Sequence, residues 1–382
     1  MIPYGRQAIT DADIQAVVDV LRSDFLTQGP AVPAFEGAVA RYCTARYAVA
    51  VNSGTSALHV ACQALGIGAG DWVWTSPNTF VASANCALYS GARVDFVDID
   101  ARSYNLSVER LTEKLEQAAK TGRLPKVVIP VHFAGHACEM AGIQSLAQRY
   151  GFKVIEDASH AVGGRYRGEL VGNGRYSDIT VFSFHPVKII TTAEGGMALT
   201  GDRALADRMA RLRSHGITRD RNLLTNQEEG PWYYEQIELG YNYRMTDLQA
   251  ALGLSQLRRL EEYVTRRREL AARYDELLEG LPLITPWESP EVRSATHLYV
   301  VRLAPGFSRT DVFAHLRSAG IGASVHYIPV HLQPYYRQLG FQRGDFPESE
   351  KYYEQAISLP LHPTLTTADQ DRVVAALRHA LG

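Results

Sequence analysis

One lysine in this sequence stands in a setting that suggests chemistry. Lys188 follows the largely apolar run Val181-Phe182-Ser183-Phe184-His185-Pro186-Val187 and precedes Gly195-Gly196. Lysine rarely enters a protein interior unless it is paired or put to chemical use. In an apolar site its pKa falls well below the usual value of about 10.4, and the neutral amine is a nucleophile that forms Schiff bases. The ordinary alternative is a lysine at a strand end that extends its ammonium to water.

A second candidate stretch is suited to an anion. Asn52-Ser53-Gly54-Thr55-Ser56 follows a predicted strand at 48–51 and opens a predicted helix. Free backbone amides at a helix N-terminus, together with hydroxyls, form a binding site for phosphate. An ordinary N-cap gives the same pattern.

Two further strand ends complete a recognisable set. Asp157 follows the apolar pair Val154-Ile155 and is suited to hold a cationic ring nitrogen, or alternatively to cap a helix. Phe80 follows the strand at 72–74 and is suited to stack on a planar ring, although a lone Phe more often belongs to the core. With Lys188 and the phosphate site, these residues meet the requirements of pyridoxal 5′-phosphate. Ser183, five residues before Lys188, adds a hydroxyl for the phosphate.

A parallel sheet would bring these residues together. Short apolar runs alternate with amphipathic segments from about residue 30 to residue 160. Such repeats predict an α/β fold with helices on both faces of the sheet, and ligands that bind beyond the carboxyl ends of the strands. The predicted strands are 48–51, 72–74, 94–97, 127–131 and 154–155, and the predicted helices lie near 12–21, 55–65, 79–90, 107–120 and 138–150.

The second half of the chain predicts a different organisation. The glycine-rich passage 163–174 lacks a phosphate-loop ending and predicts a hairpin or loop. Thr246 and Gln249 form a capping box before a helical pattern that reaches residue 278. We expect two domains, namely 1–255 with the N-terminal segment and the large cofactor-binding domain, and 256–382 with a long linking helix and a small C-terminal α+β domain. The remaining predicted elements are strands at 179–184, 196–200, 297–303 and 323–327, helices at 202–213, 309–318 and 367–380, and a polar loop at 219–234.

Composition narrows the functional classes. The 382 residues are 46% hydrophobic and 21% charged, with a net charge of −2 and no long basic run, which argues against nucleic acid as a partner. No apolar window approaches the length of a membrane span, and the first residues lack the apolar run of a signal peptide. The four cysteines are widely spaced, without a C-x-x-C pair. We therefore expect a cytoplasmic protein that does not bind a membrane.

Five separated motifs resemble those of the DegT-type nucleotide-sugar aminotransferases, which are fold-type I pyridoxal phosphate enzymes. The motifs are N-S-G-T-S-A-L, S-P-N-T-F-V-A-S-A-N, E-D-A-S-H-A-V-G, S-F-H-P-V-K-I-I-T-T-A-E-G-G and G-Y-N-Y-R-M-T-D-L-Q-A-A-L. The resemblance covers nearly the whole chain. Within the family, the lysine motif and L-R-S-H-G-I-T-R-D are most similar to the transaminases of pseudaminic acid biosynthesis.

The resemblance implies a fold and a reaction. It implies a large, mainly parallel sheet domain with a small C-terminal α+β domain, and pyridoxal 5′-phosphate as the cofactor. The implied reaction moves an amino group from L-glutamate to the C4 keto group of a UDP-linked 4-keto-6-deoxy-N-acetylhexosamine. Another nucleotide-linked 4-keto sugar, of the UDP-pentose or GDP-perosamine type, remains an alternative because the cofactor site would be the same.

The resemblance also implies roles for single residues. Lys188 would hold the cofactor covalently, Asp157 would pair with the pyridinium nitrogen, and His160 would lie beside the ring, near its 3′-oxygen or the ring edge. The role of His185 stays open. The other implied cofactor-binding residues are Gly54, Thr55, Phe80, Ser183 and Asn242, the last reaching the neighbouring subunit of a homodimer with shared active sites. The implied substrate-binding residues are Tyr4, Leu26, Thr27, Ser53, Asn242, His326 and Tyr327.

Two other functional classes deserve comparison. A metal site is suggested by His132, His136, Cys138 and Glu139, but they lack an established metal-ligand spacing, so we expect no metal. A non-catalytic regulator that binds pyridoxal phosphate is the other alternative. The presence of both Lys188 and Asp157 argues against it.

Overall fold

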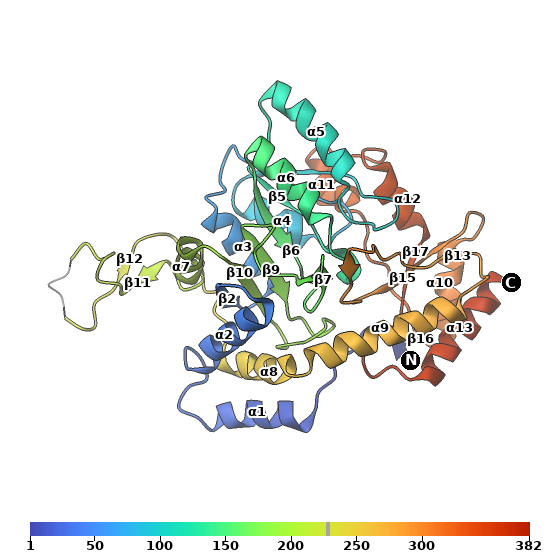
Figure 1. Ribbon diagram of the computed structural model, residues 1–382, viewed down its shortest axis with the longest axis horizontal. Helices are drawn as coiled ribbons and strands as arrows, with labels where there is room; N and C mark the ends of the chain where they lie inside the picture. The colour runs from blue at the N-terminus through green and yellow to red at the C-terminus, as the bar shows by residue number, and fades with distance from the viewer. Residues whose placement is uncertain (227–229) are drawn as a thin grey trace.

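A seven-stranded sheet forms the centre of the protein (Figure 1). The computed structural model describes residues 1–226 and 230–382. Strand β10 is antiparallel to both of its neighbours, and the other pairings in this sheet are parallel. The predicted mainly parallel sheet is therefore confirmed. In spatial order the strands are β2 (Tyr47–Val51), β10 (Gly196–Thr200), β9 (Ile179–Ser183), β6 (Lys153–Asp157), β5 (Val127–Ile129), β3 (Trp72–Thr75) and β4 (Arg93–Phe96).

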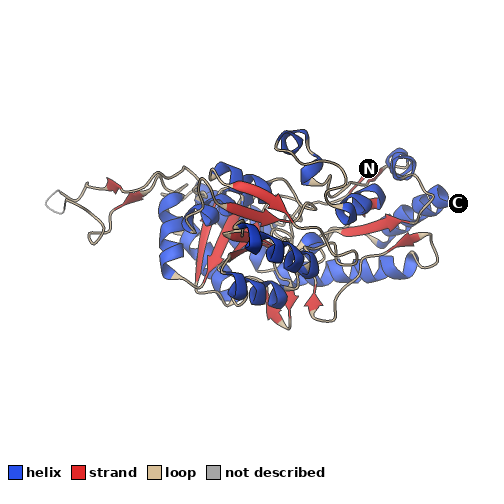
Figure 2. Ribbon diagram, turned by 90° about the horizontal axis from the view of Figure 1, so that it is seen from above, coloured by secondary structure: helices blue, strands red, loops and turns tan. Residues whose placement is uncertain are grey.

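Both faces of this sheet are covered by helices, as Figure 2 shows. Successive residues of a strand point to opposite faces of the sheet. A strand that is apolar at every position is therefore covered on both faces. Ile155 and Val181 belong to one apolar cluster, whereas their neighbours Val154 and Phe182 belong to another. The first cluster includes helices α3 (Gly54–Ala64), α4 (Ala82–Tyr89) and α7 (Arg203–Leu212); the second includes α2 (Ala31–Cys43), α5 (Val108–Thr121), α6 (Met140–Tyr150) and α8 (Asp247–Leu257).

The C-terminal third has its own apolar cluster. It packs helices against a three-stranded antiparallel sheet of order β13-β15-β17. This part therefore combines helices with antiparallel strands, as expected. The domain boundary at residue 255 stays a prediction. The elements of this part are α9 (Leu260–Leu277), β13 (Leu283–Ile284), β14 (Val292–Arg293), β15 (Tyr299–Leu303), α10 (Arg309–Ser318), β16 (Ile321–Gly322), α11 (Pro334–Gln338), α12 (Pro347–Gln355), β17 (Ala356–Leu359) and α13 (Thr367–Leu381).

The single long helix predicted after Thr246 is in fact two. The capping box is present, since Gln249 N–H donates to the Thr246 hydroxyl and Thr246 N–H donates to the Gln249 side chain. Helix α8 then ends, and α9 begins at Leu260, so that the pair runs nearly end to end in Figure 1. Arg259 leaves the helical conformation, with φ −109° and ψ 9°, and pairs with the buried Asp13 at 2.6 Å. A contact distant in sequence therefore breaks the helix.

Some elements of the small sheets also differ from the prediction. The strand predicted at 323–327 is wrong, because only Ser324 forms a bridge there, with Ser358. The real strand lies just before it, where β16 pairs in parallel with β1 (Ile2–Pro3). Helix α2 and strand β17 were not anticipated from the sequence pattern, whereas the helix near 12–21 is confirmed as α1 (Asp11–Leu21).

Two hairpins lie outside the central sheet. The glycine-rich passage forms β7 (Arg165–Tyr166) and β8 (Glu169–Leu170), which confirms the predicted hairpin. Strands β11 (Ile217–Thr218) and β12 (Glu235–Gln236) pair at the base of an arm that leaves the body of the protein in Figures 1 and 2. The predicted polar loop lies between them, and its residues 227–229 lie outside the described residues. In the part of the chain that the structure describes, no helix is long and apolar enough to cross a bilayer.

Candidate functional site

A cavity of about 420 Å³ lies beyond the carboxyl ends of β6 and β9, at the start of α3. Its position is the one expected for ligands of a parallel sheet. It brings together residues from both ends of the chain. The sequence-predicted residues that line it are Tyr4, Ser53, Gly54, Thr55, Phe80, Asp157, His160, Ser183, His185, Lys188, His326 and Tyr327.

Lys188 lies half-buried in the turn that follows β9. Its backbone N–H donates to His185 O at 2.9 Å, which folds the chain back toward the cavity. Burial lowers the pKa of the Lys188 amine to about 8, although the nearby Asp157 charge acts in the opposite direction. Roughly a tenth of this amine is therefore uncharged at pH 7, and the uncharged amine is the form that attacks carbonyls.

Asp157 is the last residue of β6 and is buried. Its register opposite Val181 of β9 sets it beside the strand that leads to Lys188. The Ser83 hydroxyl donates to Asp157 Oδ2 at 2.6 Å, and Ser159 N–H donates to Oδ1 at 3.1 Å. Both carboxylate oxygens are thus held by the protein, with lone pairs left for a ligand.

His160 lies in a group of buried imidazoles. Its Nε2 lies 3.2 Å from the Tyr327 hydroxyl, and its ring centroid lies 4.5 Å from that of His297. Burial, reinforced by the charge of Lys188, holds the pKa of His160 well below its usual range, so the ring is neutral. Its Nδ1 is buried without a hydrogen-bond partner among the described residues, which indicates a site for a ligand or a water molecule.

The start of α3 has the geometry of a phosphate cradle. Ser53 is its N-cap, because Ser56 N–H donates to the Ser53 hydroxyl at 3.0 Å. The first amides of any helix have no intrahelical partner, and here they belong to Gly54 and Thr55. A Cβ on Gly54 would lie 2.9 Å from Ser183 Cβ, so only glycine allows this close approach of helix and strand.

These features together fit pyridoxal 5′-phosphate. The cradle suits a phosphate, Asp157 suits a protonated ring nitrogen, and Lys188 suits an aldehyde. Phe80 stands at the wall with 57% of its surface exposed, and its ring centroid lies 6.2 Å from that of Tyr327. An aromatic side chain left this exposed beside the cavity is available to a planar ligand.

Three predicted residues lie outside this cavity. Leu26 O accepts from Asp247 N–H, and Thr27 forms a bridge with Thr246 at the start of α8. Asn242 is exposed and bridged to Ser214. Within one chain these three do not reach Lys188, so their substrate and phosphate roles stay predictions that require a second copy.

Sequence reasoning missed the partners of two site residues. Ser83 contacts Asp157 across 74 residues of sequence, and Thr79 lines the cavity beside it. Both lie in the motif S-P-N-T-F-V-A-S-A-N, where their four-residue spacing was the available signal. His297, which packs on His160, had no local signal at all.

Three of the four candidate metal residues, His132, His136 and Cys138, have protein partners. His132 Nε2 lies 2.7 Å from Glu156, and Cys138 Sγ donates to Val131 O at 3.2 Å. Ser289 N–H donates to His136 Nε2 at 3.1 Å. Among residues 1–226 and 230–382, no group of three or more such side chains is arranged to hold a metal ion.

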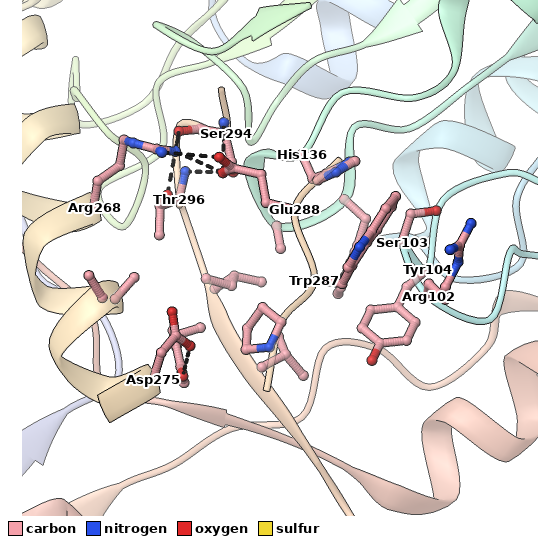
Figure 3. A pocket seen from close by; sticks show the side chains of 18 residues that line it. Arg102, Ser103, Tyr104, His136, Arg268, Asp275, Trp287, Glu288, Ser294 and Thr296 are labelled. Carbon is pink, nitrogen blue, oxygen red and sulfur yellow. Dashed lines mark hydrogen bonds and ion pairs between the residues drawn. The ribbon is translucent and has the colours of Figure 1, made fainter. Parts of the chain in front are cut away.

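A second cavity, of about 200 Å³, lies between α9 and the loop around Ser103 (Figure 3). Its polar side chains largely bond to one another. Arg268 pairs with Glu288 at 2.7 Å, and the Tyr299 hydroxyl donates to Asp275 at 2.6 Å. Since no lysine or cysteine is found among its lining residues, it lacks the nucleophile that distinguishes the Lys188 cavity.

Comparison with known proteins gives consistent matches over the whole chain. The profile of the DegT/DnrJ/EryC1/StrS aminotransferase family matches residues 7–378. The spore coat polysaccharide biosynthesis protein SpsC of Bacillus subtilis is 42% identical over 99% of this chain and 96% of its own. The UDP-4-amino-4-deoxy-L-arabinose–oxoglutarate aminotransferase of Shewanella sediminis is 38% identical over 100% of this chain and 98% of its own.

Solved structures match equally well. Helicobacter pylori PseC, an aminotransferase involved in the biosynthesis of pseudaminic acid, superposes with a TM-score of 0.91 at 30% identity, covering 100% of this chain and 99% of its own. The putative sugar aminotransferase Spr1654 of Streptococcus pneumoniae in its pyridoxamine phosphate form gives 0.90 at 31% identity, with the same coverage. Its pyridoxal phosphate form gives 0.89 at 30% identity, covering 99% and 98%.

Proposed function

This chain belongs to the DegT/DnrJ/EryC1/StrS aminotransferase family, and we propose that it is a pyridoxal 5′-phosphate-dependent nucleotide-sugar aminotransferase. Its proposed reaction moves an amino group from L-glutamate to the C4 keto group of a UDP-linked 4-keto-6-deoxy-N-acetylhexosamine. The observation that carries this proposal is the convergence of Lys188, Asp157 and the start of α3 on one cavity. The structural similarity to PseC, with a TM-score of 0.91 at 30% identity, supports the choice of sugar.

The bound cofactor would supply an aldehyde that carries the amino group and a ring that accepts electrons from the reacting carbon. Lys188 Nζ would hold that aldehyde and, once displaced by the amino donor, move a proton to and from the reacting carbon. A pKa of about 8 suits this task, since both forms of the amine are populated near neutral pH. Its half-buried position near the cavity wall keeps it within reach of a ligand.

Other residues would bind and orient. Asp157 would accept a hydrogen bond from the ring nitrogen and hold it protonated. Neutral His160 would face the ring's 3′-oxygen through a nitrogen that has no described protein partner. Gly54, Thr55 and Ser183 would bind the phosphate at the helix terminus. Asn242 of a second subunit would complete this site.

A UDP-linked 4-ketopentose is the second candidate substrate. The observation in its favour is the 38% identity to an aminotransferase named for 4-amino-4-deoxy-L-arabinose. The two sugars differ at C2 and C5, outside the reacting keto group. The cofactor site is therefore the same for both, and only the sugar-binding wall can distinguish them.

The decisive experiment is a panel of UDP- and GDP-linked 4-keto sugars supplied with L-glutamate and pyridoxal phosphate. We expect release of 2-oxoglutarate and formation of an amino sugar, greatest with the UDP-linked N-acetylhexosamine. Lys188→Ala should lower turnover by orders of magnitude, while Lys153→Ala, which removes an exposed lysine paired with Asp178, should not. The proposal fails if no 4-keto nucleotide sugar is aminated, or if Lys188→Ala matches the wild type.

A further inference from the structure

Two buried hydroxyls link the cavity wall to Asp157. Thr79 Oγ1 lies 2.7 Å from Ser83 Oγ, and Ser83 Oγ lies 2.6 Å from Asp157 Oδ2. The three residues are 2%, 0% and 5% exposed. Ser83 belongs to the first turn of α4 and Thr79 to the loop before it, so the pair reaches from the end of β3 across β5 to the end of β6.

The chemistry of the carboxylate fixes the direction of these hydrogen bonds. An ionised carboxylate only accepts, so Ser83 must give its single hydroxyl proton to Asp157 Oδ2. Ser83 Oγ can then only accept from Thr79, which must donate its own proton. The Thr79 oxygen is left as an acceptor at the cavity wall.

We propose that Ser83, supported by Thr79, is a positioning residue that holds the Asp157 carboxylate directed at the ring nitrogen of bound pyridoxal phosphate. This inference rests on the proposed function. A donor to each oxygen, Ser159 N–H on Oδ1 and the Ser83 hydroxyl on Oδ2, fixes the plane of the carboxylate. The remaining lone pairs lie in that plane and are available to one further donor.

The Ser83 hydroxyl also opposes a competing partner of Asp157. Lys188 lies in the same cavity, and its amine is stabilised in the charged form by Asp157. A carboxylate without a second anchor is free to turn toward that ammonium. The hydrogen bond from the Ser83 hydroxyl opposes this rotation, because a charged acceptor roughly doubles the strength of a hydrogen bond.

Removal of the Ser83 hydroxyl leaves Oδ2 buried without its donor. The carboxylate can recover a protein partner for that oxygen only by rotating, and rotation weakens its bond to the ring nitrogen. Loss of this hydrogen bond to a charged group should therefore weaken the interaction between Asp157 and the ring nitrogen roughly tenfold. The phosphate and aldehyde contacts do not involve Ser83 and should be unaffected.

The test compares pyridoxal phosphate with its 1-deaza analogue, in which carbon replaces the ring nitrogen. Binding of each compound to the apoprotein is followed by quenching of tryptophan fluorescence, without any assay of turnover. Both compounds carry the same phosphate and aldehyde, so the contributions of these groups to binding cancel in the ratio of the two dissociation constants. We expect Ser83→Ala to lower the preference for pyridoxal phosphate roughly tenfold. Ser83→Thr, which restores the hydroxyl, should regain the wild-type ratio.

Thr79 supplies a second pair of variants with the same reasoning. Thr79→Val removes the donor to Ser83 at nearly constant volume and should lower the ratio less than Ser83→Ala does, because Asp157 keeps its direct donor. Thr79→Ser keeps the hydroxyl and should behave as the wild type. These variants separate hydrogen bonding from packing.

The outcomes separate the inference from the proposed function. If the wild-type apoprotein binds neither compound, the proposed function is wrong. If it prefers pyridoxal phosphate and Ser83→Ala keeps that preference, or loses affinity equally for both compounds, Ser83 is merely structural and the inference is overturned. A wild-type protein that binds both compounds equally well overturns the inference too, since Asp157 would then not engage the ring nitrogen.

Discussion

At the scale of single residues, the cost of a reactive lysine should be measurable as lost stability. The pKa of Lys188 falls from its usual range to about 8 in the folded chain because burial penalises the ammonium. The unfolded chain therefore binds more protons between pH 8 and about 10.4, so this destabilisation is fully present below pH 8 and disappears as the pH rises through that window. Lys188→Met should stabilise the apoprotein at pH 7 by on the order of 2 kcal/mol. Thermal unfolding at pH 7 and pH 10 measures this gain, which should nearly vanish at the higher pH.

An exposed lysine provides the matched control. Lys153 pairs with Asp178 at the surface of β6, where its ammonium remains in water. Lys153→Met should change stability by no more than about 1 kcal/mol at either pH. A Lys188→Met protein that is less stable than the wild type at pH 7 would show that the amine is well accommodated, contrary to this expectation.

At the scale of elements, the contact between α3 and β9 leads to a second prediction. Gly54→Ala would force a Cβ to 2.9 Å from Ser183 Cβ, and helix and strand must then separate. We expect a loss of about 1–3 kcal/mol in stability, together with a large loss of affinity for pyridoxal phosphate because the cradle widens. Equilibrium unfolding and cofactor titration measure the two effects.

Gly68→Ala is a suitable control for that variant. A Cβ on Gly68 would meet nothing within 4 Å, and its backbone is not in the left-handed region. The substitution should leave cofactor affinity unchanged. Equal losses of affinity in both variants would argue that the start of α3 does not hold the phosphate.

The elements also show which parts of the fold a sequence can predict. Buried parallel strands were recognisable because each is a nearly continuous apolar run, and β6 and β9 fall where they were expected. The break between α8 and α9 was not, since it depends on the pairing of Arg259 with Asp13 from a distant segment. Helix α2 was obscured by Pro33 in its first turn, a position that a helix tolerates but that a pattern search takes for a break.

The candidate site also contains residues that the sequence predicts and residues that it does not. Gly54, Asp157 and Lys188 were recognisable because each follows a strand, and the carboxyl ends of parallel strands meet at one edge. Ser83 and His297 were not, because their importance comes only from contacts made in three dimensions. Residue type and local spacing therefore predict the groups that touch a ligand better than the groups that hold them in place.

At the scale of the whole molecule, buried neutral histidines should make the protein sensitive to acid. Burial holds the pKa of His326 to about 4 and those of His160 and His297 well below their usual range. The unfolded chain takes up these protons near pH 6.5, so stability is lost as the pH falls from about 6.5 toward 4. With three such groups, the free energy of unfolding should change by up to about 4 kcal/mol per pH unit. Urea unfolding at pH 7.5, 6.5 and 5.5 measures it.

Variants can assign that slope to its source. His326→Gln should reduce the slope of unfolding free energy against pH by the contribution of about one proton. His379→Gln, at an exposed position on α13, should leave this slope unchanged. A slope that is the same in all three proteins would place the acid sensitivity elsewhere.

The proposed homodimer gives a prediction at the same scale. Asn242 is exposed and outside the Lys188 cavity of its own chain, so a role at the phosphate requires a second copy. Lys188→Ala and Asn242→Ala subunits should each form weakly active homodimers. Mixed dimers, isolated with two affinity tags, should recover about half of the wild-type sites, because one site then receives both native residues. Mixed dimers no more active than their parents would rule out a shared site.

The first residues of the chain impose an order on its biosynthesis. Strand β1 pairs with β16, and Leu361 N–H donates to Tyr4 O at 2.9 Å. Tyr4, which lines the cavity, thus depends on partners that are translated more than three hundred residues after the first strand. A nascent chain halted before residue 321 has made the sheet, the lysine and the helix terminus, yet one wall of the cavity has no anchor. Loading of the cofactor is therefore expected to follow the synthesis of residue 361 rather than precede it.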